Sequence, residues 1–225
     1  MGKPDIIYED NDIIICYKPA GIATQTRRIG QQDMESFIRN YRAAKNEPPY
    51  VGIVHRLDQP VEGVMVFAKN QKAAASLSRQ IKEHTTEKYY RAASRGQGVS
   101  GAAVEDEEAW HTLTDYISFD KHTNTSKITS EKDRLAKKAV LQYRVISVTP
   151  DRDSSQNECI RTEFDIKLLT GRHHQIRLQL ANIGYPLIGD TKYGGDTARE
   201  QLALCSYKIV FDHPGTGERV TFELP

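Results

Sequence analysis

The chain has 225 residues, of which 38% are hydrophobic and 27% are charged, and its formal net charge is +1. This balance excludes an intrinsically disordered chain, and because no apolar run approaches about 18 residues, a membrane-spanning helix is excluded as well. Three cysteines outside any CxxC spacing indicate neither a disulfide framework nor a zinc site, and the N-terminus does not resemble a signal peptide, so we expect a cytoplasmic protein that does not bind a membrane.

The first half of the chain predicts two strands, each followed by a helix. Apolar runs at residues 13–17 and 64–68 predict buried strands. Apolar residues recur at helical spacing within residues 34–41 and again within residues 72–84, which predicts two helices. Since no linker rich in Pro, Gly or Ser interrupts the chain, we expect residues 1–225 to form a single domain.

The second half predicts strands that follow one another, with one helix among them. Residues 174–183 carry apolar side chains at helical spacing before Gly184, which favours a helix that ends there. Residues 149–158 are polar and predict a loop. Because strands outnumber helices without a βαβ rhythm, we expect an α+β fold with a mostly antiparallel sheet. The expected strands are 139–148, 163–169, 203–211 and 220–224, the last two as a hairpin.

The densest group of chemically active residues lies just before the strand at residues 64–68. Side chains alternate along an extended chain, so Arg56 and Asp58 should share one face, with His55 and Leu57 on the other. A carboxylate beside a guanidinium at the junction of a strand and a loop can form part of a pocket. The alternative is a structural Asp58 that hydrogen-bonds its own turn.

A second group lies at the start of the helix expected at residues 174–183. The free N–H groups and the positive dipole end of a helix start are suited to an anion. We expect the adjacent His173 and His174 to point in different directions, which makes a metal pair improbable on this spacing. Arg177 lies one helical turn after His173 and could face the same cleft. The alternative is a set of ordinary residues at a helix start.

A basic and aromatic stretch follows the second expected helix. Tyr89 and Tyr90 lie between cations at positions 88 and 91. Aromatic rings beside cations can stack on an unstacked RNA base, although the same residues are common in ordinary strands. With a net charge near zero, an RNA surface has to come from segregated charge, and Arg79 with Lys82 is one such cluster.

In their order along the chain, the motifs resemble the RluA-type family of RNA pseudouridine synthases. The resemblance rests on IYEDNDIIICYKPAG at 7–21, HRLDQPVEGVMVFAK at 55–69, KYY at 88–90, TGRHHQIRLQLANIGYPLIGDTKY at 170–193 and LALCSYKIVFDHP at 202–214. It implies the pseudouridine synthase catalytic fold, in which helices and loops flank a mixed, mostly antiparallel central sheet with a cleft across it. It also implies isomerisation of selected uridines in RNA, with no cofactor and no metal.

The resemblance further implies a role for individual residues. Asp58, in the HRLD motif, is the carboxylate that acts on the nucleoside, either as a nucleophile or as a base. Tyr90 stacks on the uracil and assists proton removal from C5, and Arg177 pairs with Asp58, which keeps that carboxylate ionised. Arg56 enters the RNA when the target base is flipped out. The further substrate-binding residues that the resemblance implies are His55, Arg172 and His174.

The chain departs from the family pattern at several positions. Val61 and Glu62 stand where Thr and Ser are usual. Because a second carboxylate in the cleft would oppose ionisation of Asp58, we expect Glu62 to point away or to meet an arginine. The other departures are His173 in place of Thr, and Cys205 and Ser206 in place of His and Ala.

We therefore expect a stand-alone catalytic domain, without the small N-terminal RNA-binding domain of many relatives, that acts as a monomer on a loop of rRNA or tRNA. Two alternatives stay open. A catalytically inactive RNA-binding paralogue would bind RNA without isomerising it, and an enzyme on free nucleosides would turn over uridine without salt-dependent affinity for RNA. For the leading hypothesis, Arg177 should lie within ion-pair reach of Asp58, and Tyr90 should line the same cleft.

Overall fold

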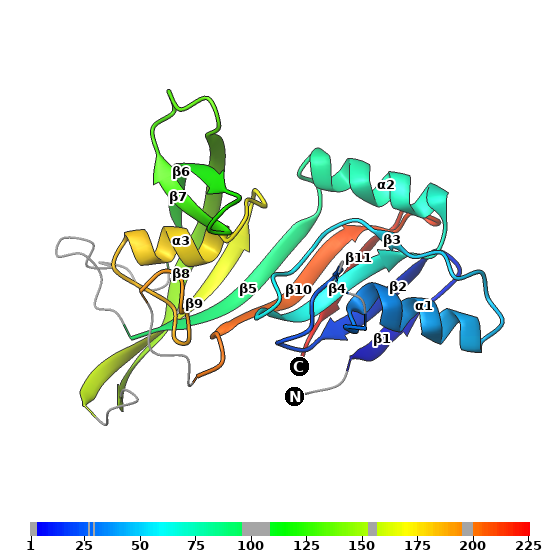
Figure 1. The fold of residues 1–225 in the computed structure, drawn as a ribbon, viewed down its shortest axis with the longest axis horizontal. Helices are drawn as coiled ribbons and strands as arrows, with labels where there is room; N and C mark the ends of the chain where they lie inside the picture. The colour runs from blue at the N-terminus through cyan, green and yellow to red at the C-terminus, as the bar shows by residue number, and fades with distance from the viewer. Residues whose placement is uncertain (1–3, 27, 29, 96–108, 153–156, 195–199) are drawn as a thin grey trace. The chain divides into compact units, whose positions relative to one another are not determined.

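The computed structural model describes residues 4–26, 28, 30–95, 109–152, 157–194 and 200–225 (Figure 1). It divides into two compact units, the first made of Met1–Lys88 with Ser206–Pro225 and the second of Tyr89–Cys205. Three helices and eleven strands lie in the described ranges, which confirms the α+β prediction. Within those ranges no helix is long and apolar enough to cross a membrane. The single-domain prediction stays a prediction.

The first unit is a sheet with two helices, built on the apolar runs that the sequence shows. Its strand order is β1-β2-β4-β10-β11, and β3 pairs with β4. Ile15, Val66 and Phe211 of the sheet share one buried cluster with Leu77 of the second helix. The elements are β1 (Asp5–Glu9), β2 (Ile13–Lys18), α1 (Met34–Ala44), β3 (Gly52–Ile53), β4 (Glu62–Ala68), α2 (Gln71–Lys82), β10 (Leu204–Asp212), which begins in the second unit, and β11 (Arg219–Glu223).

Local capping sets where the two helices of this unit begin and end. Asp33 caps α1 in a capping box with Ser36, and the Asn70 side chain accepts the N–H of Ala73 at 2.8 Å at the start of α2. The helix expected over residues 72–84 ends two residues early. His84 has a φ of 59°, a left-handed conformation that stops a helix in the way a C-terminal glycine does.

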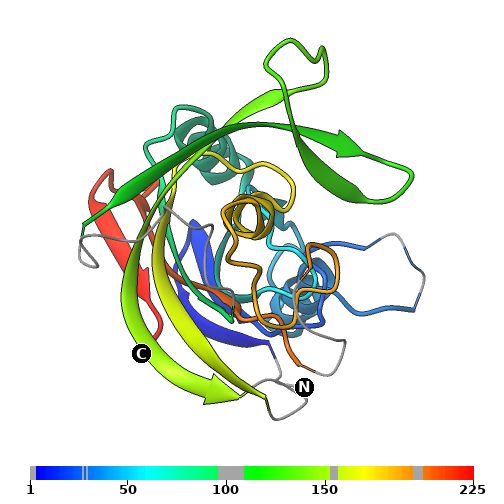
Figure 2. The same cartoon turned by 90° about the vertical axis from the view of Figure 1, so that its left-hand side faces the viewer.

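The second unit is an antiparallel sheet with one helix. Its strand order is β5-β9-β8-β6-β7. Figure 2 shows the long strands β8 and β9 curving, with the helix on their concave side. Phe164 of β9, Leu141 of β8 and Leu180 of the helix are fully buried. The elements are β5 (Glu87–Ser94), which begins in the first unit, β6 (His111–Asp120), β7 (Thr125–Thr129), β8 (Lys137–Arg152), β9 (Glu158–Leu168) and α3 (Gln175–Asn182).

The loop predicted at residues 149–158 is in large part wrong. Strand β8 continues to Arg152, and Pro150 lies opposite Ile160 of β9 in the antiparallel register. An ion pair between Arg95 Nε and Asp151 Oδ2, at 2.9 Å, supports this end of the ribbon. Main-chain pairing and this ion pair therefore outweigh the polar composition of residues 149–152. Residues 153–156 lie outside the described residues.

Candidate active site

In the first unit, the loop that carries Asp58 is fastened to the segment that follows β2. The N–H of Gly21 donates to the carbonyl of Gln59 at 2.8 Å. The hydroxyl of Thr24 accepts the N–H of Leu57 at 3.1 Å and donates to the Leu57 carbonyl at 2.9 Å. The N–H of Val61 donates to the Asp58 carbonyl at 3.0 Å and closes a turn. Main-chain bonds on both sides of Asp58 thus fix its backbone.

A buried lysine lies beneath this loop. Lys18 is fully buried, and its ammonium group donates to the carbonyls of Ile22 at 2.7 Å, Pro19 at 3.1 Å and Gln59 at 3.2 Å. Burial lowers the pKa of Lys18 to about 8, although the negative charges of Asp58 and Glu62 act in the opposite direction. Lys18 therefore joins the segment after β2 to the Asp58 loop and places a cation near the carboxylate.

The depressed pKa of Lys18 predicts a pH dependence of stability. Between about 8 and about 10.5, the lysine of the unfolded chain holds its proton while the folded protein releases it, so stability rises with pH. Relative to Lys18→Met, the free energy of unfolding of the wild type should rise across this window by roughly 1 to 3 kcal/mol. Urea unfolding of both proteins at several pH values measures this difference, and parallel pH curves would contradict the prediction.

Of the alternation predicted around Asp58, the structure bears out the contrast between Arg56 and Leu57. Leu57 is buried and Arg56 is exposed, where its Nη2 donates to Oε1 of Gln25 at 2.8 Å. Nε2 of His55 accepts the N–H of Val66 at 3.1 Å. Burial, with a contribution from the charge of Lys88, lowers the pKa of His55 to about 3. His55 is therefore neutral, with its proton on Nδ1, and joins the loop to β4.

The departures at positions 61 and 62 fit this environment. Val61 is buried, and Oε2 of Glu62 accepts the hydroxyl of Tyr17 at 2.8 Å, a partner that we did not predict. Gly63, with a φ of +133°, lies so close to Ser206 that a Cβ atom would be 2.2 Å from the Ser206 carbonyl oxygen. Only glycine fits at this point, immediately after the loop.

In the second unit, Arg177 forms a buried pair with Asp190. Its Nε donates to Oδ2 and its Nη2 to Oδ1, both at 2.7 Å, and both side chains are buried. Asp190 also accepts the N–H of Lys192 at 2.9 Å. Burial by itself raises the pKa of Asp190, but the hydrogen bonds and the charge of Arg177 outweigh it, and the pKa lies below its usual value. The plane of the guanidinium is thus fixed.

The two histidines before α3 differ from our expectation. Their rings are stacked, with centroids 3.6 Å apart, so the prediction that they point in different directions is wrong. The cause is the left-handed backbone of His174, with a φ of 53°. Nδ1 of His174 lies 2.8 Å from the hydroxyl of Tyr193, and burial, with the charge of Arg177, lowers the pKa of His174 to about 3. His174 is therefore neutral.

The remaining predicted residues of this unit lie on β5 and at the start of α3. Tyr90 is buried on β5, opposite Ile166 of β9. Nε of Arg172 donates to the carbonyl of Lys138 at 2.8 Å, which fastens the turn before α3 to β8. The first unit thus holds Asp58, His55 and Arg56, and the second holds Tyr90, Arg172, His174 and Arg177. A pair between Asp58 and Arg177, and a cleft that they share with Tyr90, stay predictions.

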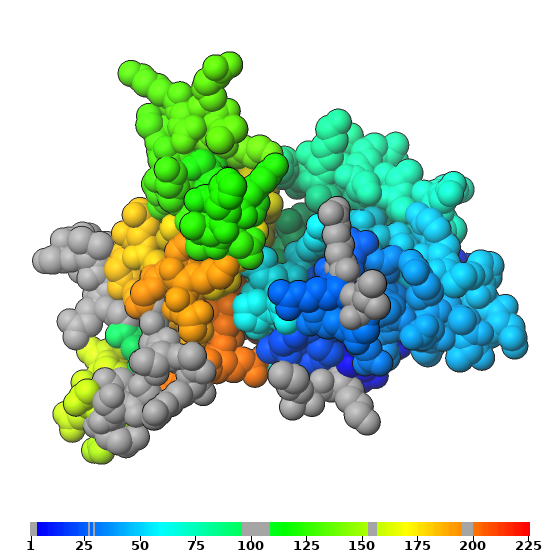
Figure 3. Space-filling model, in the orientation of Figure 1, coloured from blue at the N-terminus to red at the C-terminus, as the bar shows by residue number. Residues whose placement is uncertain are grey.

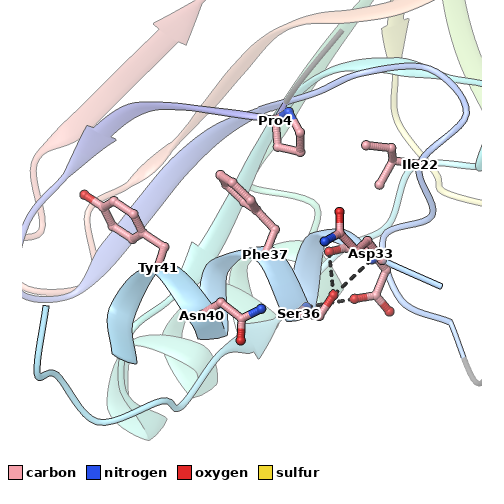
Figure 4. Close-up of a pocket in the computed structure, with 8 residues that line it drawn as sticks. Pro4, Ile22, Asp33, Ser36, Phe37, Asn40 and Tyr41 are labelled. Carbon is pink, nitrogen blue, oxygen red and sulfur yellow. Dashed lines mark hydrogen bonds between the residues drawn. The ribbon is translucent and has the colours of Figure 1, made fainter. Parts of the chain in front are cut away.

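A pocket of about 260 Å³ in the first unit is lined in part by Phe37 and Tyr41 of α1 and by Pro4 (Figure 4). Its polar groups at Asp33 and Ser36 belong to the helix cap, in which Asp33 accepts the N–H of Ser36 at 2.8 Å. The described residues that line it include none of the predicted site residues. We therefore assign it no part in the candidate site.

Comparison with known proteins shows that the predicted site residues, from His55 to Arg177, lie within the match to one protein family. A family model described as RNA pseudouridylate synthase covers residues 12–182. An uncharacterized RNA pseudouridine synthase, YhcT, of Bacillus subtilis is 33% identical over 227 residues, which cover 100% of this chain and 69% of the relative. Ribosomal large subunit pseudouridine synthase D of Neisseria meningitidis is 32% identical over 235 residues, and the match covers 98% of this chain but only 58% of that protein.

Solved structures confirm the fold. The structure of human RNA pseudouridylate synthase domain containing 1 superposes with a TM-score of 0.74 at 23% identity, over 99% of this chain and 83% of that one. Human RNA pseudouridylate synthase domain containing 4 gives a TM-score of 0.73 at 18% identity, over 98% of this chain and 88% of that one. At these identities the likeness concerns the fold alone.

Proposed function

The chain belongs to the RNA pseudouridylate synthase family, whose reaction is the isomerisation of uridine to pseudouridine in RNA, and we propose that it carries out this reaction with Asp58, Tyr90 and Arg177. The observation that carries the proposal is the single family match over residues 12–182, which contains all three residues. The fixed backbone of Asp58 and the buried pair of Arg177 support it, because a reacting group has to be held in place.

The reaction rearranges bonds within one nucleotide. The glycosidic bond between C1′ and N1 breaks, the uracil turns, and a bond forms between C1′ and C5. The C5 proton leaves and N1 takes up a proton. Because uridine and pseudouridine are isomers, no oxidant, reductant or second substrate is consumed. Asp58 acts on the nucleoside either by attacking C1′ or by removing a proton, and both routes require an ionised carboxylate.

Arg177 is proposed to keep Asp58 ionised and aimed. Its bonds to Asp190 use Nε and Nη2, and the rigid fork of an arginine carries five N–H donors, so one guanidinium can bind two carboxylates at once. A cation next to Asp58 lowers the pKa of that carboxyl. The pair with Asp190 then positions Arg177, while Arg177 positions the reacting group.

Tyr90 is proposed to stack on the uracil and to remove the C5 proton through its hydroxyl. Tyr90→Phe keeps the ring and loses the hydroxyl, so we expect release of the C5 proton to slow by about 10²-fold or more with RNA affinity unchanged. Tritium release and a binding titration measure the two effects. Tyr89→Phe is the matched control and should retain the wild-type rate. The ring of Tyr89 lies 5.4 Å from Nζ of Lys167. A wild-type rate of tritium release in Tyr90→Phe would show that the hydroxyl takes no part in proton removal, and stacking would then be the only role of Tyr90.

The substrate that we propose is a uridine in a loop of rRNA or tRNA, bound by a monomer in the cytoplasm. A base in a loop is less stacked than one in a helix, so flipping it out costs less free energy. Relatives in Neisseria and Vibrio are named ribosomal large subunit pseudouridine synthases, which supports rRNA. Arg56 is exposed next to the Asp58 loop and is proposed to enter the space that the flipped base leaves.

Tritium release from RNA tests this function. The purified protein is incubated with cellular RNA that carries tritium at C5 of uracil, taken from cells that lack the gene. Release into water supports the proposal. Salt-dependent RNA binding without release would indicate an inactive RNA-binding paralogue, and turnover of free uridine without RNA affinity would indicate a nucleoside enzyme.

A further inference from the structure

A chain of hydrogen-bonded side chains runs through the second unit, from β6 to the turn before α3. Gln175 and Gln179 are one helical turn apart on α3, and both are buried, with relative exposures of 3% and 0%. Nε2 of Gln179 donates to Oδ2 of Asp115 on β6 at 2.6 Å, and Nε2 of Gln175 donates to Oε1 of Gln179 at 3.0 Å. Oε1 of Gln175 accepts the N–H of Arg172 at 3.0 Å and the hydroxyl of Thr170 at 2.8 Å. We call the side chains of Asp115, Gln179, Gln175 and Thr170 the amide relay.

The direction of the amides in the relay is fixed by its two ends. An ionised carboxylate can only accept, so the amide nitrogen of Gln179 has to face Asp115. A main-chain N–H can only donate, so the amide oxygen of Gln175 has to face Arg172. Each glutamine therefore has a single amide orientation, and a reversal at one position requires a reversal at the other positions.

The relay takes the place of a helix cap. His174, the N-cap residue of α3, makes no side-chain cap bond. Gln175 instead closes the turn in both directions, because its N–H donates to the Arg172 carbonyl at 3.1 Å while its side chain accepts the Arg172 N–H. Thr170 continues the relay to β8, where its hydroxyl oxygen accepts the N–H of Val140 at 2.8 Å. The start of α3 is thus fastened to two strands.

The relay anchors the helix that carries Arg177. Figure 3 shows the surface of residues 170–190, in yellow and orange, directly against the green surface of β6 and β7 in the same unit, and α3 contacts both strands. Arg177 lies between Gln175 and Gln179 on this helix, and its guanidinium bonds to Asp190. Rotation or sliding of α3 would move that guanidinium. The relay opposes both motions, because its bonds join the helix to β6 and to the turn before it.

We propose that the amide relay positions Arg177 for the reaction, an inference that rests on the proposed function. Gln175, Gln179 and Asp115 are then positioning residues. A displacement of about 1 Å in a group that orients the reacting carboxylate can lower a rate about 10²-fold. The relay should therefore act on the rate of isomerisation and not on RNA affinity. The alternative is a buried network that only stabilises the fold.

The test reverses the relay and then completes it in the reversed direction. In Gln175→Glu, the new carboxylate still accepts the N–H of Arg172, but it cannot donate to Gln179, whose amide must turn and point its oxygen at Asp115. Adding Asp115→Asn supplies an N–H for that oxygen and completes the reversed relay. Asp115→Asn alone keeps an oxygen for the original direction. Gln142→Glu, at a half-buried glutamine of β8 outside the relay, is the matched control for the added charge.

Two kinds of readout are taken on each protein. In a proton–nitrogen correlation NMR spectrum, the Nε–H resonance of Arg177 reports the environment of the guanidinium independently of activity, and its loss in Arg177→Lys assigns it. The main-chain amide resonances of the same spectrum show whether a variant is folded. Single-turnover tritium release from C5-tritiated cellular RNA measures the rate, and filter binding of the same RNA measures the affinity.

We expect Gln175→Glu to shift the Arg177 resonance and to slow tritium release about tenfold or more, with RNA affinity within about threefold of the wild type. Adding Asp115→Asn should restore both, whereas Asp115→Asn alone and Gln142→Glu should stay near the wild type. If Gln175→Glu does not fold, Gln179→Met, which interrupts the relay without adding charge, should show the same two effects. A loss that Asp115→Asn does not rescue, or an unchanged resonance in the interrupting variant, would overturn the proposal.

The outcome is separable from that of the proposed function. No tritium release from the wild type would refute the isomerisation, while the Arg177 resonance in the same set of variants would still show whether the relay holds that side chain. Release by the wild type, with a shifted resonance but an unchanged rate in Gln175→Glu, would keep the isomerisation and refute the role of the relay in it.

Discussion

Replacing Asp58 by alanine should lower tritium release from C5-labelled RNA by at least about 10³-fold, with RNA affinity within about threefold of the wild type. The loop should survive the change, because the main chain of Leu57, Asp58 and Gln59 makes hydrogen bonds that fasten the loop and close its turn, and these bonds remain in the variant. A loss of rate without a loss of binding is the expected result for a group that acts on the reacting nucleoside.

Glu62→Gln is the matched control for Asp58→Ala. Glu62 is a carboxylate four residues away on the same segment, and Tyr17 hydrogen-bonds it. The amide of glutamine can still accept that hydroxyl, so we expect release within about threefold of the wild type. Equal losses in both variants would show that the net negative charge of the segment matters, and not the carboxylate at position 58. Full activity of Asp58→Ala would show that Asp58 is not part of the active site.

Periodicity in the sequence predicts the elements that bury apolar side chains. The strands predicted at residues 13–17 and 64–68 are confirmed, and nearly every side chain in them is buried. The terminal hairpin is confirmed as well, because the alternation of apolar residues continues across a turn rich in Gly and Pro. Strands β6 and β7 escaped prediction because two of their buried positions hold Ser118 and Ser126, so no regular apolar alternation marks them. Residues 149–152 also read as a loop, since their strand is set by pairing with β9.

Motifs indicate which residues to examine, but not the partners that hold them. Lys18 follows an apolar run and looks like a charged end of a strand, while its three carbonyl partners come together only in the fold. Asp190 is thirteen residues after Arg177, and no helical or strand spacing links the two. The GDxxY motif could have indicated these partners, because its two fixed polar residues are Asp190 and Tyr193. Such partners require tertiary structure.

Asp190→Asn should strongly destabilise the second unit. It removes the carboxylate that accepts two hydrogen bonds from the buried guanidinium of Arg177, and breaking a buried pair from one side costs about 3 to 5 kcal/mol. Asparagine can still accept the N–H of Lys192 through its amide oxygen, so the main effect is on Arg177. Urea unfolding measures the loss of free energy, and isomerisation should be lost with it.

A second variant separates the structural role of Arg177 from its proposed role in the reaction. Arg177→Met combined with Asp190→Asn removes both buried charges, so the free energy of unfolding should return to within about 2 kcal/mol of the wild type. Tritium release should stay at least about 10²-fold below the wild type, because the double variant lacks the guanidinium that we propose as the partner of Asp58. If activity returned along with stability, Arg177 would serve only to pair with Asp190. The carboxylate of Asp58 would then have to be kept ionised by another cation, such as the buried Lys18, which has a charge interaction with it.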